Sequence, residues 1–277
     1  MPSFLFLYSL FGLIVGSFLN VCIHRIPRRE SIAFPGSHCP GCNRPIRPID
    51  NIPVLSYLFL RGKCRFCGMR ISLQYPIVEL LGALAFCACA LRWGLAAPTF
   101  VNSLFIAVVI VLFFTDYWHQ VLPNVLTLPG ILAGIALSPF QDPAYYYDGA
   151  SYYLAGLFSP SDPGKALPWA GALLGALVGG GILFVVGWAY QATRKKQGLG
   201  MGDVKMMSFV GAFLGWRLAF LTIFAGSLLG SLLGVFLVLF RGGTMQAKLA
   251  FGTFLGLSAV GALFYGLRLL EWYLKGL

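Results

Sequence analysis

Long apolar runs alternate with short polar segments along this chain. A helix needs about 20 apolar residues to cross the hydrocarbon core of a bilayer, and most of the runs approach or exceed that length. They predict eight transmembrane helices, at residues 1–23, 77–91, 93–115, 121–141, 166–193, 203–216, 218–240 and 249–267. The pattern therefore indicates an all-α polytopic membrane protein embedded in the lipid bilayer.

Composition supports a membrane protein and argues against a nucleic-acid partner. Hydrophobic residues make up 58% of the chain and charged residues only 10%, whereas soluble domains carry roughly 25% charged residues. The net charge of +11 could suggest binding to nucleic acid. The basic residues, however, cluster in a few short segments between the apolar runs, so we expect no nucleic-acid partner.

The distribution of basic residues orients the predicted helices. With eight spans, 15 of the 20 Lys and Arg side chains lie on the same side of the membrane as segment 24–76. That segment is therefore predicted to be cytoplasmic, with both termini outside. Segment 142–168 is rich in Pro, Tyr, Ser and Asp without periodicity, which predicts an irregular external loop. Gly171, Gly175 and Gly179 recur at a four-residue spacing that lets membrane helices approach closely.

Segment 24–76 also contains two Cys-x-x-Cys pairs separated by 21 residues. The four cysteines are Cys39, Cys42, Cys64 and Cys67. Two such turns point four thiolates at one tetrahedral ion, a spacing typical of a small zinc-ribbon-like loop. Gly41 and Gly68 stand where tight turns favour glycine. Four thiolates leave no open position for water, so the predicted zinc is structural. Four free reduced thiols are the alternative, and a cytoplasmic location disfavours disulfides.

Three of the nine carboxylates touch the apolar runs, namely Glu79, Asp116 and Asp203. Ionisable groups in membrane segments are functional candidates. Asp116 ends the third predicted span, Asp203 opens the sixth, and the orientation drawn from Lys and Arg places both at the cytoplasmic face. Two acids at one depth can share a proton, so that one takes a proton from water while the other polarises a carbonyl. This pair predicts an intramembrane aspartyl protease. Alternatively, each is a helix-end acid near the headgroups, Asp203 being favoured there by the helix dipole.

Beyond these features, the chain resembles the type IV prepilin peptidases, the bifunctional leader peptidase and N-methyltransferase family. The resemblance covers nearly the whole length. It is carried by residues 16–21, 50–56, 60–65, 71–76 and 78–81, both Cys-x-x-Cys pairs, Asp116 with Leu122-Pro123-Asn124, and Gly200-Met-Gly-Asp203-Val-Lys205. Together these motifs are highly specific, although none of them would be so alone.

The resemblance implies a bacterial inner-membrane enzyme whose catalytic residues are Asp116 and Asp203. Its substrates would be prepilins or pseudopilins of type IV pilus assembly, type II secretion or DNA uptake, cleaved after a glycine. The new N-terminus would be methylated with S-adenosylmethionine. The residues expected to support the peptidase site are Gly200, Gly202, Lys205, Phe251 and Gly252.

The resemblance also implies a division of the chain. Residues 1–23 form the first helix, 24–76 the cysteine loop associated with methyl transfer, and 77–277 the peptidase core. Glu79 is a candidate to contact the cofactor or the new ammonium group, and a helix-entry acid is the alternative. In one place the chain departs from the family. The family tends to show Pro-Phe-Gly-Pro near the last span, where this chain has Ala250-Phe-Gly-Thr253.

Three other interpretations compete with a prepilin peptidase. A presenilin-like peptidase usually carries Tyr before the first aspartate, whereas Thr115 precedes Asp116 here. A proton-coupled transporter would place its acids near the bilayer midplane, often in repeated halves, and no internal repeat is evident. A non-catalytic zinc-binding membrane adaptor would explain the cysteines but not the aspartates.

Overall fold

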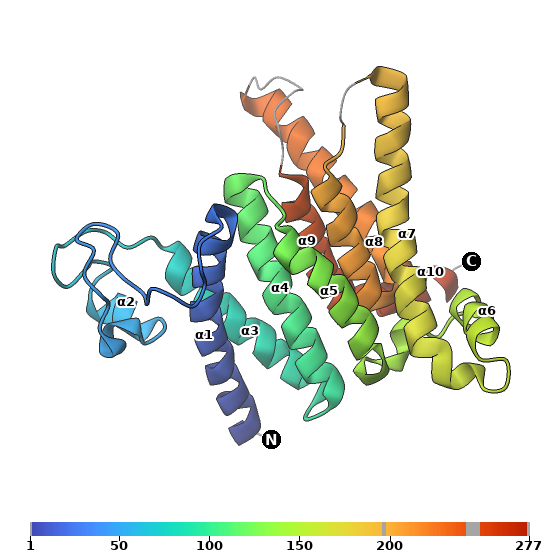
Figure 1. Ribbon diagram of the computed structural model, residues 1–277, viewed down its shortest axis with the longest axis horizontal. Helices are drawn as coiled ribbons and strands as arrows, with labels where there is room; N and C mark the ends of the chain where they lie inside the picture. Colours follow the sequence, from blue (N-terminus) through green and yellow to red (C-terminus); the bar gives the residue numbers. More distant parts are fainter. Residues whose placement is uncertain (1, 196–197, 242–249, 276–277) are drawn as a thin grey trace. The chain divides into compact units, whose positions relative to one another are not determined.

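The computed structural model describes residues 2–195, 198–241 and 250–275, and within these ranges helices are the main secondary structure, with no β-strand (Figure 1). The α-helices are α1 (Pro2–Arg25), α2 (Leu55–Phe59), α3 (Gln74–Trp93), α4 (Ala97–His119), α5 (Asn124–Leu137), α6 (Gly149–Phe158), α7 (Pro163–Arg194), α8 (Met201–Arg241), α9 (Phe251–Gly261) and α10 (Leu267–Lys275). The short helices are η1 (Ile26–Arg28), η2 (Pro48–Asn51), η3 (Ser138–Phe140), η4 (Pro143–Tyr145) and the π turn η5 (Ala262–Gly266). The expectation of an all-α fold is confirmed.

Six of the described helices are long and apolar enough to cross a membrane. They occupy Ser3–Arg28, Gln74–Trp93, Ala97–His119, Pro163–Arg194, Met201–Phe240 and Phe251–Lys275. The fourth predicted span corresponds to a shorter apolar helix, Asn124–Phe140. The sixth and seventh predicted spans both fall in α8, which is interrupted at Gly215 by a non-helical backbone conformation. The protein is thus a multi-pass membrane protein, and the count of eight crossings stays a prediction.

The chain divides into two compact units, Met1–Val111 and Leu112–Leu277. In the first unit, α1 packs against α3 through facing glycines. A β-carbon on Gly12 would lie 2.6 Å from the carbonyl oxygen of Gly82, and one on Gly16 would lie 2.6 Å from the Cα of Glu79. Because such distances exclude any side chain, glycine lets these two backbones touch.

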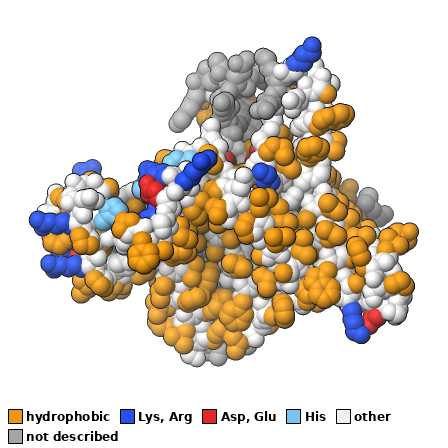
Figure 2. Space-filling model, viewed as in Figure 1, with side chains coloured by type: hydrophobic (Ala, Val, Ile, Leu, Met, Phe, Trp, Pro, Cys, Tyr) orange, Lys and Arg blue, Asp and Glu red, His pale blue; other side chains and the backbone are white. Residues whose placement is uncertain are grey.

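In the second unit, α8 packs against α5, α7 and α9. The predicted glycine series of α7 lines this packing, so the expectation of close helix approach is confirmed. Gly175 meets the backbone of Gly211, and Gly179 meets the carbonyl oxygen of Met207. Gly171 instead accommodates the ring of Tyr146. Hydrophobic side chains cover much of the helical surface visible in Figure 2, while Lys and Arg gather over the cysteine loop.

The break in α8 is held by side chains from the segment before α6. Gly215 has φ 76° and ψ 169°, a conformation that favours glycine. The Tyr146 hydroxyl donates to the carbonyl oxygens of Ala212 and Phe213, at 3.0 Å each, and Gln141 Nε2 donates to Phe213 O at 3.3 Å. In a continuous helix, backbone N–H groups of the next turn would donate to these carbonyl oxygens, and here the side chains donate instead.

One local expectation was wrong. Segment 142–168 was expected to be irregular, yet residues 149–158 form α6. Asp148 explains the helix, because its carboxylate accepts hydrogen bonds from Ser151 N at 3.0 Å and Ser151 Oγ at 2.8 Å and so caps the first turn. Lys196 and Lys248, which contributed to the predicted orientation, and Leu249, the start of the eighth predicted span, lie outside the described residues.

Candidate active site and metal centre

Asp116 lies in the last turn of α4 and is buried, with 6% of its surface exposed. Its carboxylate faces the first turn of α9. Thr253 donates to Asp116 Oδ2 twice, from its backbone N–H at 2.7 Å and from its hydroxyl at 3.2 Å. A helix N-terminus favours such a negatively charged group, because its first N–H groups lack partners within the helix. The carboxylate of Asp116 is therefore fixed in place by a segment 137 residues away.

Gly252 allows this approach. A β-carbon on Gly252 would lie 2.9 Å from Asp116 Oδ2 and 3.0 Å from Leu122 Cδ1. Any larger residue would push α9 away from the carboxylate. The predicted supporting residue Phe251 is placed differently, with its ring about 4.0 Å from the position of a β-carbon on Gly230 in α8.

Asp203 lies in the first turn of α8 and is half-buried. Its backbone N–H donates to the carbonyl oxygen of Gly200 at 3.1 Å. A β-carbon on Gly200 would lie 3.3 Å from Asp203 Oδ2, and one on Gly202 would lie 3.0 Å from Leu122 Cβ. Neither glycine has a positive φ. Close approach, not turn conformation, therefore explains the glycines of this motif.

Leu122 and Asn124, which follow α4, both contact the region of the Gly-x-Gly-Asp motif. Leu122 contacts the glycines beside both carboxyl groups, Gly252 near Asp116 and Gly202 next to Asp203. The ammonium group of Lys205 donates to Asn124 Oδ1 at 2.9 Å, which ties the start of α8 to the start of α5. The structure thus places Gly252 against Asp116 and Gly200 against Asp203, with Leu122 beside Gly252 and Gly202. Lys205 contacts Asn124 instead.

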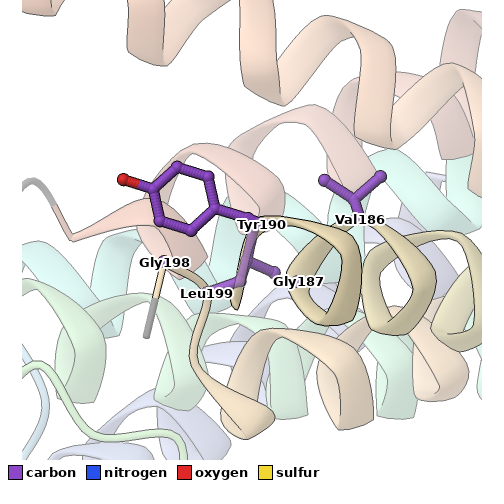
Figure 3. Close-up of a pocket in the computed structure, with 5 residues that line it drawn as sticks. All are labelled: Val186, Gly187, Tyr190, Gly198 and Leu199. Carbon is purple, nitrogen blue, oxygen red and sulfur yellow. The ribbon is translucent and has the colours of Figure 1, made fainter. Parts of the chain in front are cut away.

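A cavity of about 270 Å³ lies beside the segment that leads into this motif (Figure 3). Val186, Gly187 and Tyr190 line it from α7, and Gly198 and Leu199 line it from the segment before α8. Gly198 leaves room for the ring of Tyr190, which a β-carbon would overlap. Neither aspartate lines this cavity.

In the first unit, the four thiol sulfurs of Cys39, Cys42, Cys64 and Cys67 lie within 4.8 Å of one another. The sulfurs of Cys39 and Cys67 are 3.7 Å apart. A tetrahedral zinc ion with Zn–S bonds of 2.3 Å would separate its ligands by about 3.8 Å. The donor set and its spacing therefore fit one tetrahedral metal ion.

The two knuckles repeat one hydrogen-bond pattern. Cys39 N donates to Arg44 O at 3.0 Å, and Cys64 N donates to Met69 O at 2.8 Å. The residue after the second cysteine of each pair adopts a positive φ, 55° at Asn43 and 70° at Gly68. The prediction for Gly68 is confirmed. The turn explanation for Gly41 was wrong, because its φ is not positive and it instead makes room for the side chain of Met69.

Contacts between side chains complete the cysteine loop. Arg44 and Arg47 stack on the ring of Phe66 with their guanidinium carbons 5.1 and 5.2 Å from the ring centroid. Arg65 pairs with Asp50 through Nε–Oδ2 at 2.9 Å and Nη2–Oδ1 at 2.5 Å, which holds the pKa of Asp50 below its usual range. The second knuckle is thereby joined to the first and to η2.

The Cys64 thiol is also prepared for a metal electrostatically. The backbone N–H groups of Cys67 and Phe66 lower the pKa of the Cys64 thiol to about 6. Metals bind the thiolate and not the thiol. This favours ligation by Cys64 at neutral pH.

Glu79 is near neither aspartate in sequence, and its partners lie in the first unit. It is buried near the start of α3, and its Oε2 accepts from the backbone N–H of Val54 at 2.7 Å. Val54 has φ 61° and ψ −50°, an unusual conformation for a β-branched residue. Glu79 thus ties the part of the cysteine loop between the two cysteine pairs to α3. Sequence reasoning missed this bond and the bonds from Thr253 to Asp116. Both residues stand in segments that the sequence singled out, but neither segment indicates which carboxylate its backbone N–H will meet.

The fold and these two sites define a class of protein, a polytopic membrane enzyme with an aspartate pair and a loop whose four cysteines could hold a metal ion. The chain belongs to the type IV leader peptidase family. Residues 10–93 match the bacterial peptidase A24 N-terminal domain, and residues 103–235 match the type IV leader peptidase family.

Several full-length relatives are named prepilin leader peptidase/N-methyltransferase. The protein of Aeromonas hydrophila is 34% identical over 97% of this chain and 93% of its own length. That of Pseudomonas aeruginosa is 33% identical over 99% and 94%, and that of Bacillus subtilis strain 168 is 34% identical over 99% and 98%. No solved structure matches the chain. These comparisons do not favour the transporter or the adaptor.

Proposed function

We propose that this protein cleaves the short basic leader from prepilins or pseudopilins after a glycine, at the cytoplasmic membrane face, and then methylates the new N-terminus. The observation that carries the proposal is the placement of buried Asp116 at the start of α9, next to Leu122 and the Gly-x-Gly-Asp turn of Asp203. An aspartate pair of this kind suits amide hydrolysis. The substrate class is supported by the names of the relatives.

In the proposed reaction, Asp116 and Asp203 share one proton. The ionised member accepts a proton from water as the water oxygen bonds to the carbonyl carbon after the scissile glycine. The protonated member donates a hydrogen bond to the carbonyl oxygen as negative charge develops there. When the C–N bond breaks, the leaving nitrogen takes up a proton from the pair. The products are a leader carboxylate and a new amine.

The second reaction requires S-adenosylmethionine, which supplies an electrophilic methyl group when bound. We propose that the cysteine loop, residues 24–76, is associated with this step and holds a structural zinc ion through its four cysteines. The peptidase core is assigned to residues 77–277, with segment 142–168 outside. The distribution of Lys and Arg supports a cytoplasmic location for the loop and the aspartates, with both termini outside, in a bacterial inner membrane.

Intact mass measurement of a co-expressed prepilin tests both activities together. We expect the mature pilin to lack the leader and to carry one added methyl group, since cleavage must precede methylation of the new amine. An empty membrane provides the control. Recovery of full-length prepilin beside correctly inserted enzyme would contradict the proposed peptidase, and a cleaved but unmethylated pilin would contradict the proposed methyltransferase.

For Glu79, the sequence suggested contact with the cofactor or the new ammonium group. We propose that it serves methyl transfer by holding the cysteine loop through Val54, a role supported by the 2.7 Å bond between Glu79 Oε2 and Val54 N. An amide oxygen can accept the same bond, but a methyl group cannot.

The two roles predict different results for Glu79→Gln and Glu79→Ala. We expect Glu79→Gln to keep most methyl transfer and Glu79→Ala to lose it by roughly tenfold, because a buried backbone donor is then left without its acceptor. The measurement is tritium transfer from labelled S-adenosylmethionine to pre-cleaved pilin. If Glu79→Gln is as defective as Glu79→Ala, the negative charge is required, and contact with the cofactor or ammonium group explains Glu79 instead.

A further inference from the structure

Residue 253 is where the chain departs from the Pro-Phe-Gly-Pro string. A proline at this position would have neither a backbone N–H nor a hydroxyl. Thr253 has both groups, and both donate to Asp116 Oδ2, at 2.7 and 3.2 Å. The departure therefore supplies the hydrogen bonds that the structure shows on the buried carboxylate.

Because Asp116 and Thr253 are buried, losing one of these hydrogen bonds should be costly. Asp116 is 6% exposed and Thr253 is 9% exposed, so water is poorly placed to replace a lost donor. The Thr253 N–H is also within 3.2 Å of Ala250 O, as expected in the first turn of a helix. Every residue except proline would supply this N–H, so the hydroxyl is the donor that the threonine side chain adds at residue 253. Hydrogen bonds to ionised groups are worth more than those between neutral groups.

The residues around Asp116 hold its carboxylate in one position. Asp116 lies in the last turn of α4, where exposed Tyr117 and Trp118 follow it. Gly252 lets the start of α9 lie against the carboxylate, where the N–H and the hydroxyl of Thr253 both donate to Oδ2. A catalytic acid or base must be held within a narrow range of positions for proton transfer.

We infer that Thr253 is a positioning residue for leader cleavage, which orients the Asp116 carboxylate through its hydroxyl. This rests on the proposed function of Asp116 in peptide hydrolysis. It is a property of this chain's own sequence at residue 253 and does not extend to chains with proline there. Thr253 acts through Asp116 and need not contact the substrate.

Three variants of the full-length enzyme in membranes test the inference. Thr253→Val preserves shape and the backbone donor but removes the hydroxyl, and we expect kcat for prepilin cleavage to fall roughly tenfold. KM should stay within about twofold, because substrate binding does not use the hydroxyl. Thr253→Ser keeps the hydroxyl and should restore kcat to within about threefold of wild type.

Thr222→Val is the matched control. Thr222 is a fully buried threonine whose hydroxyl donates to Leu218 O at 2.7 Å within α8. The Thr222→Val variant measures the general cost of removing a buried hydroxyl. We expect its kcat for prepilin cleavage to equal that of wild type. Methyl transfer to pre-cleaved pilin, measured for every variant, reports whether the protein remains folded.

The outcomes are distinguishable from failure of the proposed function. If wild type does not cleave prepilin, the proposed peptidase fails. If wild type cleaves and Asp116→Asn does not, but Thr253→Val retains wild-type kcat, the positioning role is overturned while the peptidase stands. Equal losses in Thr253→Val and Thr253→Ser, with methyl transfer intact, would also overturn it, because the hydroxyl would not be the group that matters.

Discussion

Asp116→Asn and Asp203→Asn should each reduce leader cleavage by roughly a thousandfold or more, since asparagine preserves size but cannot exchange a proton with water. Both side chains lie at the ends of helices that packing already fixes, so the variants should still insert. The measurement is conversion of prepilin to mature pilin on a gel, with membranes matched for enzyme content.

Asp162→Asn provides the control for removing a carboxylate. Asp162 is a partly exposed acid paired with Lys165 at 3.0 Å, away from the Gly-x-Gly-Asp motif. An exposed ion pair contributes little, so cleavage should be unchanged. If either Asp116→Asn or Asp203→Asn cleaves near the wild-type rate, the aspartate pair is not the catalytic centre.

The same variants also separate the two chemistries. Asp203→Asn should block methylation of full-length prepilin, which exposes no new amine, but should still methylate a supplied pre-cleaved pilin. The motifs support this expectation, since both aspartates follow residue 115 whereas the cysteine loop spans 24–76. A folded Asp203→Asn enzyme that cannot methylate pre-cleaved pilin would point to a single shared centre.

Loss of the metal is the second large expected effect. Purified wild-type enzyme should contain about one zinc ion per chain, and Cys39→Ser and Cys64→Ser should each lose most of it. The two residues belong to different knuckles, whose sulfurs all lie within 4.8 Å, so removing either one leaves an incomplete tetrahedron. Elemental analysis under reducing conditions measures the metal. Methyl transfer should fall at least as much as cleavage, because the loop that shapes the proposed methyltransferase site loses its metal.

Cys87→Ala is the appropriate control for the cysteine variants. Cys87 is a half-buried thiol in α3, outside the cluster. Its replacement should leave both the zinc content and methyl transfer unchanged. Wild-type enzyme without bound metal would leave four free thiols as the explanation of the cysteine pairs. Full methyl transfer by a metal-free Cys64→Ser enzyme would disconnect the zinc from that activity.

Local sequence patterns were sufficient for much of the protein. The apolar runs identified the helical segments because a bilayer tolerates few charged groups and requires backbone groups to pair within a helix. The Cys-x-x-Cys spacing identified the four clustered thiols, since each pair fits a short turn. The glycine spacing in α7 located a close helix contact. Asp116 and Asp203 stood out because carboxylates are rare in apolar segments.

Other features could not be read from local patterns. The sequence placed a boundary at Arg217, between the predicted spans 203–216 and 218–240, but it did not indicate the positive φ of Gly215. Tyr146 and Gln141 donate hydrogen bonds to the interrupted helix at this point. From its place between Cys39 and Cys42, Gly41 was expected to be a turn glycine, yet the side chain of Met69 is what excludes a larger residue there. Such requirements arise from residues distant in sequence.

The sequence by itself determined which residue types are available for chemistry and which long apolar segments are helical, because both follow from composition and short-range spacing. Only the tertiary structure decided their partners. The bonds from Thr253 to Asp116 and from Val54 to Glu79 join residues 137 and 25 positions apart. Backbone N–H groups occur at nearly every residue, so the sequence does not indicate which one will meet a buried carboxylate. That choice is made by helix packing, where glycines bring particular backbones into contact.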